Sequence, residues 1–472
     1  MNKMNLEGLI KNISGKEMED QKKRNRELTK KIKDLNNANE NLNSRVKLLE
    51  GSKGVKLVLK YQSLWNRFPI VKFFAKIFYF VFLLPFKVSS LIKGGRNSTI
   101  SEISGIINKS SSKEVVFFIA PVLWNIPLFQ RPQHIALNIG KQGVTYFYVT
   151  KWQSKNEIRD LGKNCYEVSA VDLDFNFILE IIERFKDKKK VFVKTYSTEL
   201  EDISSFIDNV RRIGGKIIYE YVDEIDASIA GQTIPGHVLH RFEEAAKDEN
   251  QSYIVATATK LYEDISFYRK KRFAQISNGV DYKHFSRKFD TKDLPIQMLK
   301  IYQEKKPLVG YYGAFASWMD YELLKFMAEK RPEYNYILIG VDYDGTLAAS
   351  GVEEYKNIFV LPPVNYYELP RFAYFWDVCM IPFKINEVTK STSPIKLFEY
   401  MALQKPIVTT AMPECKKYES VMTAETYDEF VKYLDKAMKL RTDKKYLELL
   451  DKEAKENTWE SKARETIKLI RS

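Results

Sequence analysis

The stretch Ser393-Pro-Ile-Lys-Leu-Phe-Glu-Tyr-Met-Ala-Leu-Gln-Lys-Pro-Ile-Val-Thr-Thr410 decides the fold of this chain. Pro394 suits the first turn of a helix, where its missing N–H costs nothing, and either Ser393 or Thr392 just before it can cap that helix. Lys405-Pro406 then turns the chain into Ile407–Thr410, whose β-branched side chains favour a strand. The segment therefore predicts a helix, a short turn and a buried parallel strand.

Lys396 and Glu399 within this segment indicate a nucleotide site. They are three residues apart and so share one face of the predicted helix. A helix N-terminus with a lysine in its first turn attracts anions such as phosphate, and a carboxylate one turn further along can accept hydrogen bonds from sugar hydroxyls. The alternative is a solvated ion pair, which contributes only a few tenths of a kcal/mol.

From about residue 113 the chain alternates apolar runs with helical stretches such as 131–141 and 198–213. Near-continuous apolar strands with helical crossovers predict parallel sheets covered on both faces. The strands fall into two groups, joined near residues 282–305, and are expected at 115–120, 145–150, 191–196, 216–221 and 253–258, then at 307–312, 335–340, 357–361, 377–382 and 405–410. We therefore expect an α/β fold with two Rossmann-like domains facing a cleft, into which the carboxyl ends of both sets of strands point.

Six segments occur in the order expected for one family. They are Gln130-Arg-Pro-Gln-His134, Tyr219-Glu-Tyr-Val-Asp-Glu224, Ser277-Asn-Gly-Val-Asp281, Gly310-Tyr-Tyr-Gly313 with Trp318-Met-Asp320, the stretch Ser393–Thr410, and Asn457-Thr-Trp459. Over about residues 113–470 the chain thereby resembles GT-B fold glycosyltransferases of the family 4-like group, including relatives of the teichuronic-acid type. The resemblance implies an acceptor domain at 113–290, a nucleotide-sugar donor domain at 300–455, and a closing helix at 456–472 that crosses back to the first half.

The resemblance also assigns roles to residues of the donor site. Lys396 would face the donor diphosphate, and Glu399 would bond the ribose of the nucleotide. Gly313 would let the diphosphate approach the backbone, or would simply permit a tight turn. Asp320 would bind a sugar hydroxyl. Ser393 and Pro394 would complete the donor site at the start of the helix.

Catalysis in such an enzyme is chiefly electrostatic, because negative charge builds on the leaving diphosphate. Lys396 would supply the compensating charge. If the enzyme inverts the anomeric centre, a base must take the acceptor proton, and His134 and Asp223 are the candidates. If it retains, the leaving phosphate does that work. The structural alternative for His134 is a hydrogen-bonded histidine on the first helix, and that for Asp223 is a helix cap.

Two departures from the family pattern concern sugar and phosphate binding. Ser391 stands eight residues before Glu399, where family 4 enzymes commonly carry a glutamate that contacts the transferred sugar. The loop 314–320 lacks the Arg and Lys that many of these enzymes use to hold the diphosphate. Asp342-Tyr-Asp344 has the form of a metal-binding DxD motif, but a tripeptide of this form is frequent by chance, and we expect no metal and no other cofactor.

Almost all of the net charge of +14 comes from the N-terminal hundred residues. Residues 51–100 hold nine Lys and Arg side chains and no acidic one, whereas residues 101–472 carry 54 basic and 53 acidic side chains. A nearly neutral body argues against a nucleic-acid-binding protein, and no RNA-binding motif accompanies the basic segment. We therefore expect no nucleic acid among the partners.

A helix spanning residues 1–50 is predicted to contain a short coiled coil. Apolar positions over residues 28–49 alternate by four and three. Asn39 falls at a core position of this pattern, where a buried asparagine favours a parallel dimer. The segment predicts dimerisation or docking of a partner. A solvated single helix, or a helix packed on the body, is the alternative.

Residues 51–100 interleave aromatic and basic side chains. The longest run without a charge, Ile77–Phe86, contains Pro85 and is much shorter than the roughly 20 apolar residues that span a bilayer. Such a segment suits the interface of an anionic membrane, and a helix packed on the body is the alternative. Three dispersed cysteines suit a reducing cytosol, and the N-terminus shows no signal peptide. We expect a peripheral protein on the cytoplasmic face of the cell membrane.

These expectations combine into a membrane-attached bacterial enzyme of cell-envelope polysaccharide biosynthesis. It would move a sugar from a nucleotide-sugar donor to a cell-surface polysaccharide or lipid-linked glycan. The alternative keeps the fold but not catalysis: an inactive nucleotide- or sugar-binding scaffold in a membrane glycan-synthesis complex. The two departures at Ser391 and in loop 314–320 favour that alternative, whereas the preserved donor segment favours the enzyme.

Overall fold

The computed structural model describes residues 98–472, with gaps at 127–128, 151–156, 170–174 and 228–232. Lys93–Ser472 forms one compact unit. The predicted coiled coil at 28–49 lies outside the described residues, and so does the basic aromatic segment apart from residues 98–100. These last residues begin a helix, 98–109, whose Ile100, Ile103 and Ile107 are buried in the core. Within the described ranges, no helix combines the length and apolar character needed to cross a membrane.

The first half of the unit is built on an eight-stranded sheet with the order β3-β4-β2-β1-β5-β6-β7-β8. All neighbours are parallel except β3 and β4, which are antiparallel. The strands are β1 Glu114–Ile119, β2 Thr145–Thr150, β3 Glu157–Asp160, β4 Cys165–Ser169, β5 Lys190–Tyr196, β6 Lys216–Tyr221, β7 Ser252–Ala256 and β8 Phe273–Gln275. The helices between them are α5 Arg131–Lys141, α6 Asn176–Phe185, α7 Ser204–Arg212, α9 Gly236–Lys247 and α10 Thr259–Ser266.

The second half is built on a six-stranded sheet, entirely parallel, with the order β11-β10-β9-β12-β13-β14. Its strands are β9 Leu308–Tyr312, β10 Asn335–Ile339, β11 Ile358–Leu361, β12 Val378–Ile381, β13 Ile407–Thr410 and β14 Val421–Ala424. The α-helices are α11 Tyr282–Phe285, α12 Ile296–Gln303, α13 Tyr321–Lys330, α14 Thr346–Ser350, α15 Leu369–Ala373, α16 Glu387–Lys390, α17 Ile395–Ala402, α18 Tyr427–Leu440 and α19 Lys444–Glu456. The order in each sheet reverses beside the first strand of its half, which is where parallel α/β sheets bind ligands.

The last helix, α20 (Trp459–Arg471), packs on the first half of the chain. Trp459, Ala463 and Ile470 are buried in the same core cluster as residues of β1, β2 and α5. Thr458 pairs with Val280 in a parallel bridge just before the helix. At its end the Arg471 guanidinium forms an ion pair with Glu114, 3.0 Å away, at the start of β1.

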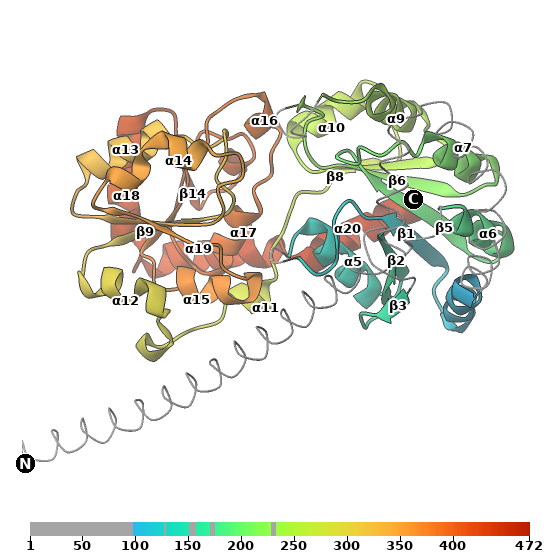
Figure 1. Ribbon diagram of the computed structural model, residues 1–472, viewed down its shortest axis with the longest axis horizontal. Coiled ribbons are helices and arrows are strands. Elements are labelled where there is room, and N and C mark those ends of the chain that lie inside the picture. Colours follow the sequence, from blue (N-terminus) through green and yellow to red (C-terminus); the bar gives the residue numbers. More distant parts are fainter. Residues whose placement is uncertain (1–97, 127–128, 151–156, 170–174, 228–232) are drawn as a thin grey trace, which may run out of the picture. The chain divides into compact units, whose positions relative to one another are not determined.

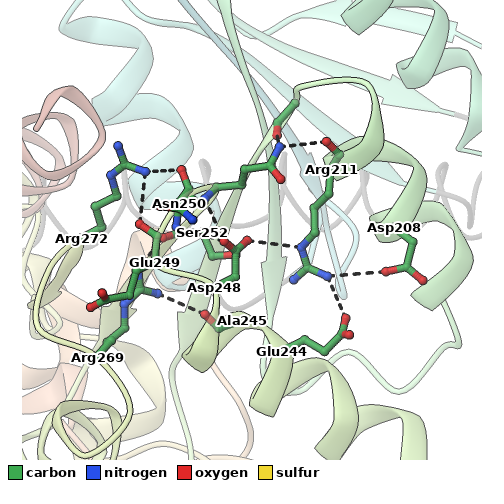
Figure 2. Close-up of polar contacts among 12 residues, drawn as sticks. Asp208, Arg211, Glu244, Ala245, Asp248, Glu249, Asn250, Ser252, Arg269 and Arg272 are labelled. Carbon is green, nitrogen blue, oxygen red and sulfur yellow. Dashed lines mark hydrogen bonds and ion pairs between the residues drawn. The ribbon is translucent and has the colours of Figure 1, made fainter.

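The amino ends of β6 and β7 are held by a network of charged side chains (Figure 2). Arg211 of α7 pairs with Glu244 of α9 at 2.7 Å. Arg269 is 1% exposed, and its guanidinium donates hydrogen bonds to the carbonyl oxygens of Ala245, 3.1 Å away, and Ser252, 2.7 Å away. This edge of the sheet is the opposite of the one at which ligands bind, so the network stabilises the scaffold rather than a site.

Candidate functional site

A cavity of about 600 Å³ lies between the two halves, at the carboxyl ends of the strands. From the first half it is lined by the start of α5, the end of β5 and the residues that follow β6. From the second half it is lined by the end of β9, the loop after β12, and the start of α17. The residues discussed below that line it are Arg131, Tyr196, Asp223, Asn278, Tyr312, Gly313, Trp318, Phe383, Ser393, Pro394, Lys396 and Glu399. The predicted cleft therefore receives residues from both sheets.

Helix α17 begins one residue later than the sequence predicts. Pro394 is the residue before the helix and has extended backbone angles, so it does not lie in the first turn. Ser393 does not cap the helix, which is a second correction. Its Oγ instead accepts a hydrogen bond from the N–H of Asn278, 3.3 Å away, in the other half. Because no side chain caps α17, its first N–H groups are available to an anion in the cavity.

Lys396 and Glu399 are not a solvated ion pair. Glu399 is 5% exposed, and its carboxylate accepts a hydrogen bond from the Tyr312 hydroxyl, 2.7 Å away. Burial raises the pKa of Glu399 to about 7, although the Tyr312 hydrogen bond and the Lys396 charge oppose the rise. Burial also lowers the pKa of Lys396, which Glu399 counteracts. The Lys396 ammonium lies 5.4 Å from the ring centroid of Tyr311.

The backbone of Gly313 lies against the side chain of Lys396. Its φ of 144° is one that residues with a side chain rarely adopt. A Cβ at this position would lie 2.2 Å from Cε of Lys396 and 2.7 Å from its Nζ. The missing side chain therefore lets the lysine lie against the backbone at the end of β9, in the cavity wall.

Asp320 is not part of the cavity wall, contrary to its predicted contact with a sugar hydroxyl. Its carboxylate caps α13 by accepting a hydrogen bond from the N–H of Leu323, 3.0 Å away. The Tyr427 hydroxyl donates to the same carboxylate, with distances of 2.8 and 3.0 Å to its two oxygens. The neighbouring Trp318 lines the cavity instead. Asp320 is a helix cap.

Asp223 lies in the cavity wall just after β6. Burial raises the pKa of its carboxyl to about 6, and the nearby Arg131 charge opposes the rise. A carboxylate with a pKa close to neutral can accept a proton and release it again. Of the two predicted bases, Asp223 is the one that lines the cavity.

His134 does not face the cavity, which corrects the second candidate base. Its side chain is 3% exposed and stacks on Trp459 of α20, with ring centroids 4.9 Å apart and planes 9° apart. Phe129 and Tyr366 pack against its edges. Burial lowers its pKa to about 3, so the ring is neutral. Its ring is enclosed by aromatic side chains, and it is not among the described residues that line the cavity.

A buried charge cluster on the first half was not predicted. Arg131, Lys194 and Glu220 are each at most 4% exposed. The Glu220 carboxylate lies 3.3 Å from Nε of Arg131 and 3.0 Å from Nζ of Lys194. Burial alone would raise the pKa of Glu220, but the two cations outweigh it and lower the value to about 2. Lys194 and Glu220 each place a charge inside an otherwise apolar strand, β5 and β6. Such a charge is the sequence signal that would have identified these two members of the cluster.

Arg131 connects this cluster to the donor side. Its guanidinium donates to the backbone oxygen of Ser277 at 3.0 Å and to Oδ1 of Asn278 at 3.3 Å. The Asn278 amide in turn donates to the backbone oxygen of Ser393, 2.6 Å away. The starts of α5 and α17 are thus tied together through Asn278, so the two helix N-termini line the cavity in a fixed relation.

The position of the missing glutamate is occupied by a contact between the two halves. The Ser391 hydroxyl donates to a carboxylate oxygen of Glu224, 2.8 Å away. Lys260 pairs with the same oxygen at 3.0 Å. The carboxylate near residue 391 therefore comes from the first half of the chain, although Glu224 does not line the cavity.

The DxD-like tripeptide serves the turn before α14. Asp342 accepts hydrogen bonds from the N–H groups of Leu347 and Ala348, at 3.3 and 3.1 Å. Asp344 accepts from the N–H of Ser317 at 2.8 Å. In the part of the chain that the structure describes, no group of His, Cys, Asp and Glu side chains is placed to hold a metal ion.

Known proteins resemble this chain in sequence and in fold. No protein-family model matches it. TuaH of Bacillus subtilis (strain 168), named as a candidate teichuronic acid biosynthesis glycosyltransferase, is 22% identical over 270 residues, which are 54% of this chain and 66% of the relative. The match thus spans just under two thirds of the relative's length.

Three solved structures share the fold over three quarters of the chain. HepE of Anabaena, solved with UDP-glucose, has a TM-score of 0.55 at 10% identity and covers 76% of this chain and 99% of its own. A glycosyltransferase from Rickettsia africae ESF-5 has a TM-score of 0.56 at 12% identity, and the match covers 76% of this chain and 98% of that structure's chain. WaaG, a glycosyltransferase of lipopolysaccharide biosynthesis, has a TM-score of 0.52 at 13% identity, and the match covers 75% of this chain and 99% of the WaaG chain. Together these similarities confirm the predicted resemblance to GT-B glycosyltransferases: the chain has the GT-B fold.

Proposed function

We propose that this protein transfers a sugar from a nucleotide donor, bound on the second half, to a glycan or lipid-linked acceptor, bound on the first half. The observation that carries the proposal is the position of Lys396 and the buried Glu399 at the uncapped start of α17, in the wall of the cavity. A cation and free N–H groups suit a diphosphate. A buried carboxylate one turn away suits the hydroxyls of a ribose.

The reaction breaks the bond between the anomeric carbon and the diphosphate oxygen, and the acceptor oxygen forms the new bond. Negative charge that builds on the leaving diphosphate would be stabilised by Lys396 and the N-terminus of α17. If the reaction inverts, the proton of the acceptor hydroxyl passes to Asp223. If it retains, the proton passes to the leaving phosphate. With this charge supplied by the protein, and in keeping with the resemblance, we propose a reaction that needs no metal.

The composition of the N-terminal hundred residues is the basis for the cellular location that we propose. Residues 51–100 carry nine basic and no acidic side chains among many aromatic ones, which favours the cytoplasmic surface of an anionic membrane. The heptad pattern over 28–49 favours a dimer or a docked partner. TuaH and WaaG are named for teichuronic acid and lipopolysaccharide biosynthesis, and a cell-envelope polysaccharide is the acceptor class that we propose here.

An inactive nucleotide-binding scaffold is the second candidate. It is favoured by Ser391 in place of a glutamate and by the absence of Arg and Lys from loop 314–320. Both candidates bind a nucleotide sugar, but only an enzyme splits it.

Donor hydrolysis separates the two candidates, because active transferases slowly pass the sugar to water. The purified protein is incubated with a panel of nucleotide sugars that begins with UDP-glucose, the donor seen in HepE. Release of free nucleoside diphosphate is then measured. We expect release from at least one donor, reduced at least tenfold in Lys396→Ala. Binding without release from any donor would support the scaffold, and neither binding nor release would overturn the proposed function.

A further inference from the structure

A second hollow of about 380 Å³ lies on the first half, next to the main cavity. Its walls include Tyr221, Glu224, Phe242, Asp264, Phe267 and Tyr268. The chain that leaves β6 separates the two spaces: Val222 and Asp223 line the main cavity, whereas Tyr221 and Glu224 line the hollow. Residues 221–224 are thus a border that the hollow and the main cavity share.

The walls combine aromatic faces with carboxylates. Phe242 packs against Tyr221 and Tyr268, with ring centroids 5.0 and 6.1 Å apart, so the rings form a row that leads outward from β6. Phe267 is 84% exposed, which is unusual for so large an apolar side chain. Across the described residues, no hydrogen bond holds the Asp264 carboxylate, so both its oxygens can accept hydroxyl groups.

The exposed rings are presented by a rigid base. Arg269 follows Tyr268 directly, and all three of its nitrogen groups donate to backbone oxygens, those of Lys271, Ala245 and Ser252, at 2.9, 3.1 and 2.7 Å. Figure 2 shows this guanidinium reaching the carbonyl of Ala245 between α9 and β7. Phe267 and Tyr268 are therefore held outward by the scaffold, which lowers the entropic cost of binding on them.

A saccharide has the chemistry that such walls recognise. A pyranose ring has an apolar face of C–H groups, which packs on aromatic rings, and a rim of hydroxyls, which donate to carboxylates. Of the described residues that line the hollow, none is a lysine or arginine. Lys260 pairs with Glu224 at 3.0 Å but does not line the hollow. Anionic lipid headgroups would therefore meet the carboxylates of Glu224 and Asp264 in its wall, so a membrane surface fits less well.

We propose that this hollow is an acceptor subsite, which binds sugar units of a glycan chain while the reacting hydroxyl lies beside Asp223. The inference rests on the proposed function and adds to it the place on the first half where the sugar units of the acceptor chain bind. Elongation of the acceptor should then strengthen binding until the hollow is filled, and not beyond.

The test is binding of the full-length protein to an immobilised panel of bacterial surface oligosaccharides of increasing length, with maltoheptaose as reference. Phe267→Ser, Tyr268→Ala and Asp264→Asn are compared with wild type. Ile296→Ala is the matched control, since Ile296 is 74% exposed on α12 in the other half. We expect at least one glycan to bind, with a loss of about tenfold in the hollow variants and none in the control. The UDP affinity of all variants is measured in parallel and should equal that of wild type, which separates failure of this subsite from failure of the donor site.

Three results would overturn the subsite. The first is a panel in which no glycan binds although UDP does. The second is glycan binding that the hollow variants leave as strong as the control. The third concerns phosphatidylglycerol vesicles: the wild type binds them, and the Phe267 and Tyr268 variants lose this binding but still bind the glycan. The exposed rings would then be a membrane contact.

Discussion

Two carboxylates in the cavity wall, Asp223 and Glu399, are raised in pKa by burial, and they have different surroundings. Glu399 is fixed by the Tyr312 hydroxyl at 2.7 Å, as suits a group that holds a ligand. Asp223 lies in the first half, where the Arg131 charge opposes the rise in its pKa, as suits a group that moves a proton. The proposed roles, binding for Glu399 and proton transfer for Asp223, rest on this difference.

Asp223→Asn should remove the acid limb of the pH profile in an inverting reaction. The base acts only when ionised, so wild-type turnover should rise with pH through about 6 and then level off. The variant should be slower by roughly 10²–10⁴-fold and show no such rise. Turnover is measured as nucleoside diphosphate release at saturating acceptor, over pH 5 to 8. An unchanged profile in the variant would exclude Asp223 as the base.

The stability of the same variant gives a readout that needs no acceptor. The folded pKa of Asp223 is raised above the unfolded value of 3.8, so the native state binds more protons and ionisation disfavours folding. Wild type should therefore lose stability relative to Asp223→Asn as the pH rises from about 4 to 6. Urea unfolding at several pH values measures the difference, and a constant difference would contradict the raised pKa.

Tyr312→Phe should weaken nucleotide binding as well as folding. The change leaves one oxygen of the buried Glu399 without its donor, which costs about 1–3 kcal/mol. Tyr336→Phe is the matched control, because its buried hydroxyl donates to the backbone oxygen of Met327 at 2.9 Å, away from the cavity. Both variants should lower the melting temperature, but only Tyr312→Phe should raise the Kd for UDP. Equal Kd values would show that Tyr312 does not position Glu399.

At the scale of elements, the start of α17 depends on the tight turn after β9. Gly313→Ala should displace Lys396, because the new methyl would lie 2.2 Å from its Cε. Gly345→Ala is the control: Gly345 also has a positive φ, 79°, but no atom lies within 4 Å of a Cβ there. Both changes cost roughly 1 kcal/mol of backbone strain. Only the first should reduce UDP affinity, by at least tenfold in calorimetric titration, and similar affinities for the two would contradict the account.

Helix α20 completes the core of the first half although it lies at the end of the chain. Trp459→Ala removes a ring that is 2% exposed against α5 and His134, so a loss of about 3–5 kcal/mol in unfolding free energy is expected. Arg464→Ala on the same helix is the control, since Arg464 is 68% exposed. Denaturant unfolding measures both. A small loss from Trp459→Ala would mean that α20 is dispensable for the first half.

The strands that alternate with helices along the chain were mostly predictable from sequence, and several short strands were not. The predicted ranges 145–150 and 216–221 coincide with β2 and β6, because β-branched and aromatic runs bounded by turn residues are distinctive. β3, β4, β8 and β14 were missed. β3 is Glu-Ile-Arg-Asp with both ends exposed, so its extended shape comes from pairing with β4 and not from its own composition.

At the scale of the whole molecule, the site predictions failed where partners come from distant parts of the chain. Ser393 does not cap α17, because Asn278 of the other half occupies its hydroxyl. His134 is enclosed because α20 brings Trp459 against it, and Asp320 is held by Tyr427 of α18. Lys396 and Glu399 line the cavity, and the helix pattern that places them on one face could be read from the local sequence. Their roles in binding and catalysis stay predictions.

Contacts between the halves hold the cavity walls together. Asn278 joins α5 to α17, and the Glu224 carboxylate binds Ser391. Further along, the Glu414 carboxylate accepts from the N–H of Thr259 at 2.7 Å. Donor and acceptor sides are thus linked by hydrogen bonds at several points, which favours reaction between two substrates held in fixed relation.

The central claim, a nucleotide site at the start of α17, is tested most directly by the Kd of UDP in calorimetric titration, with other nucleoside diphosphates tried alongside. Lys396→Ala and Glu399→Ala are compared with Glu322→Ala and Lys325→Ala, which remove an exposed ion pair of the same spacing on α13, 2.7 Å apart. The account predicts that both α17 variants bind at least tenfold more weakly, a loss of about 1.4 kcal/mol or more, while both α13 variants bind like wild type. Wild-type affinity in Lys396→Ala and Glu399→Ala would contradict it.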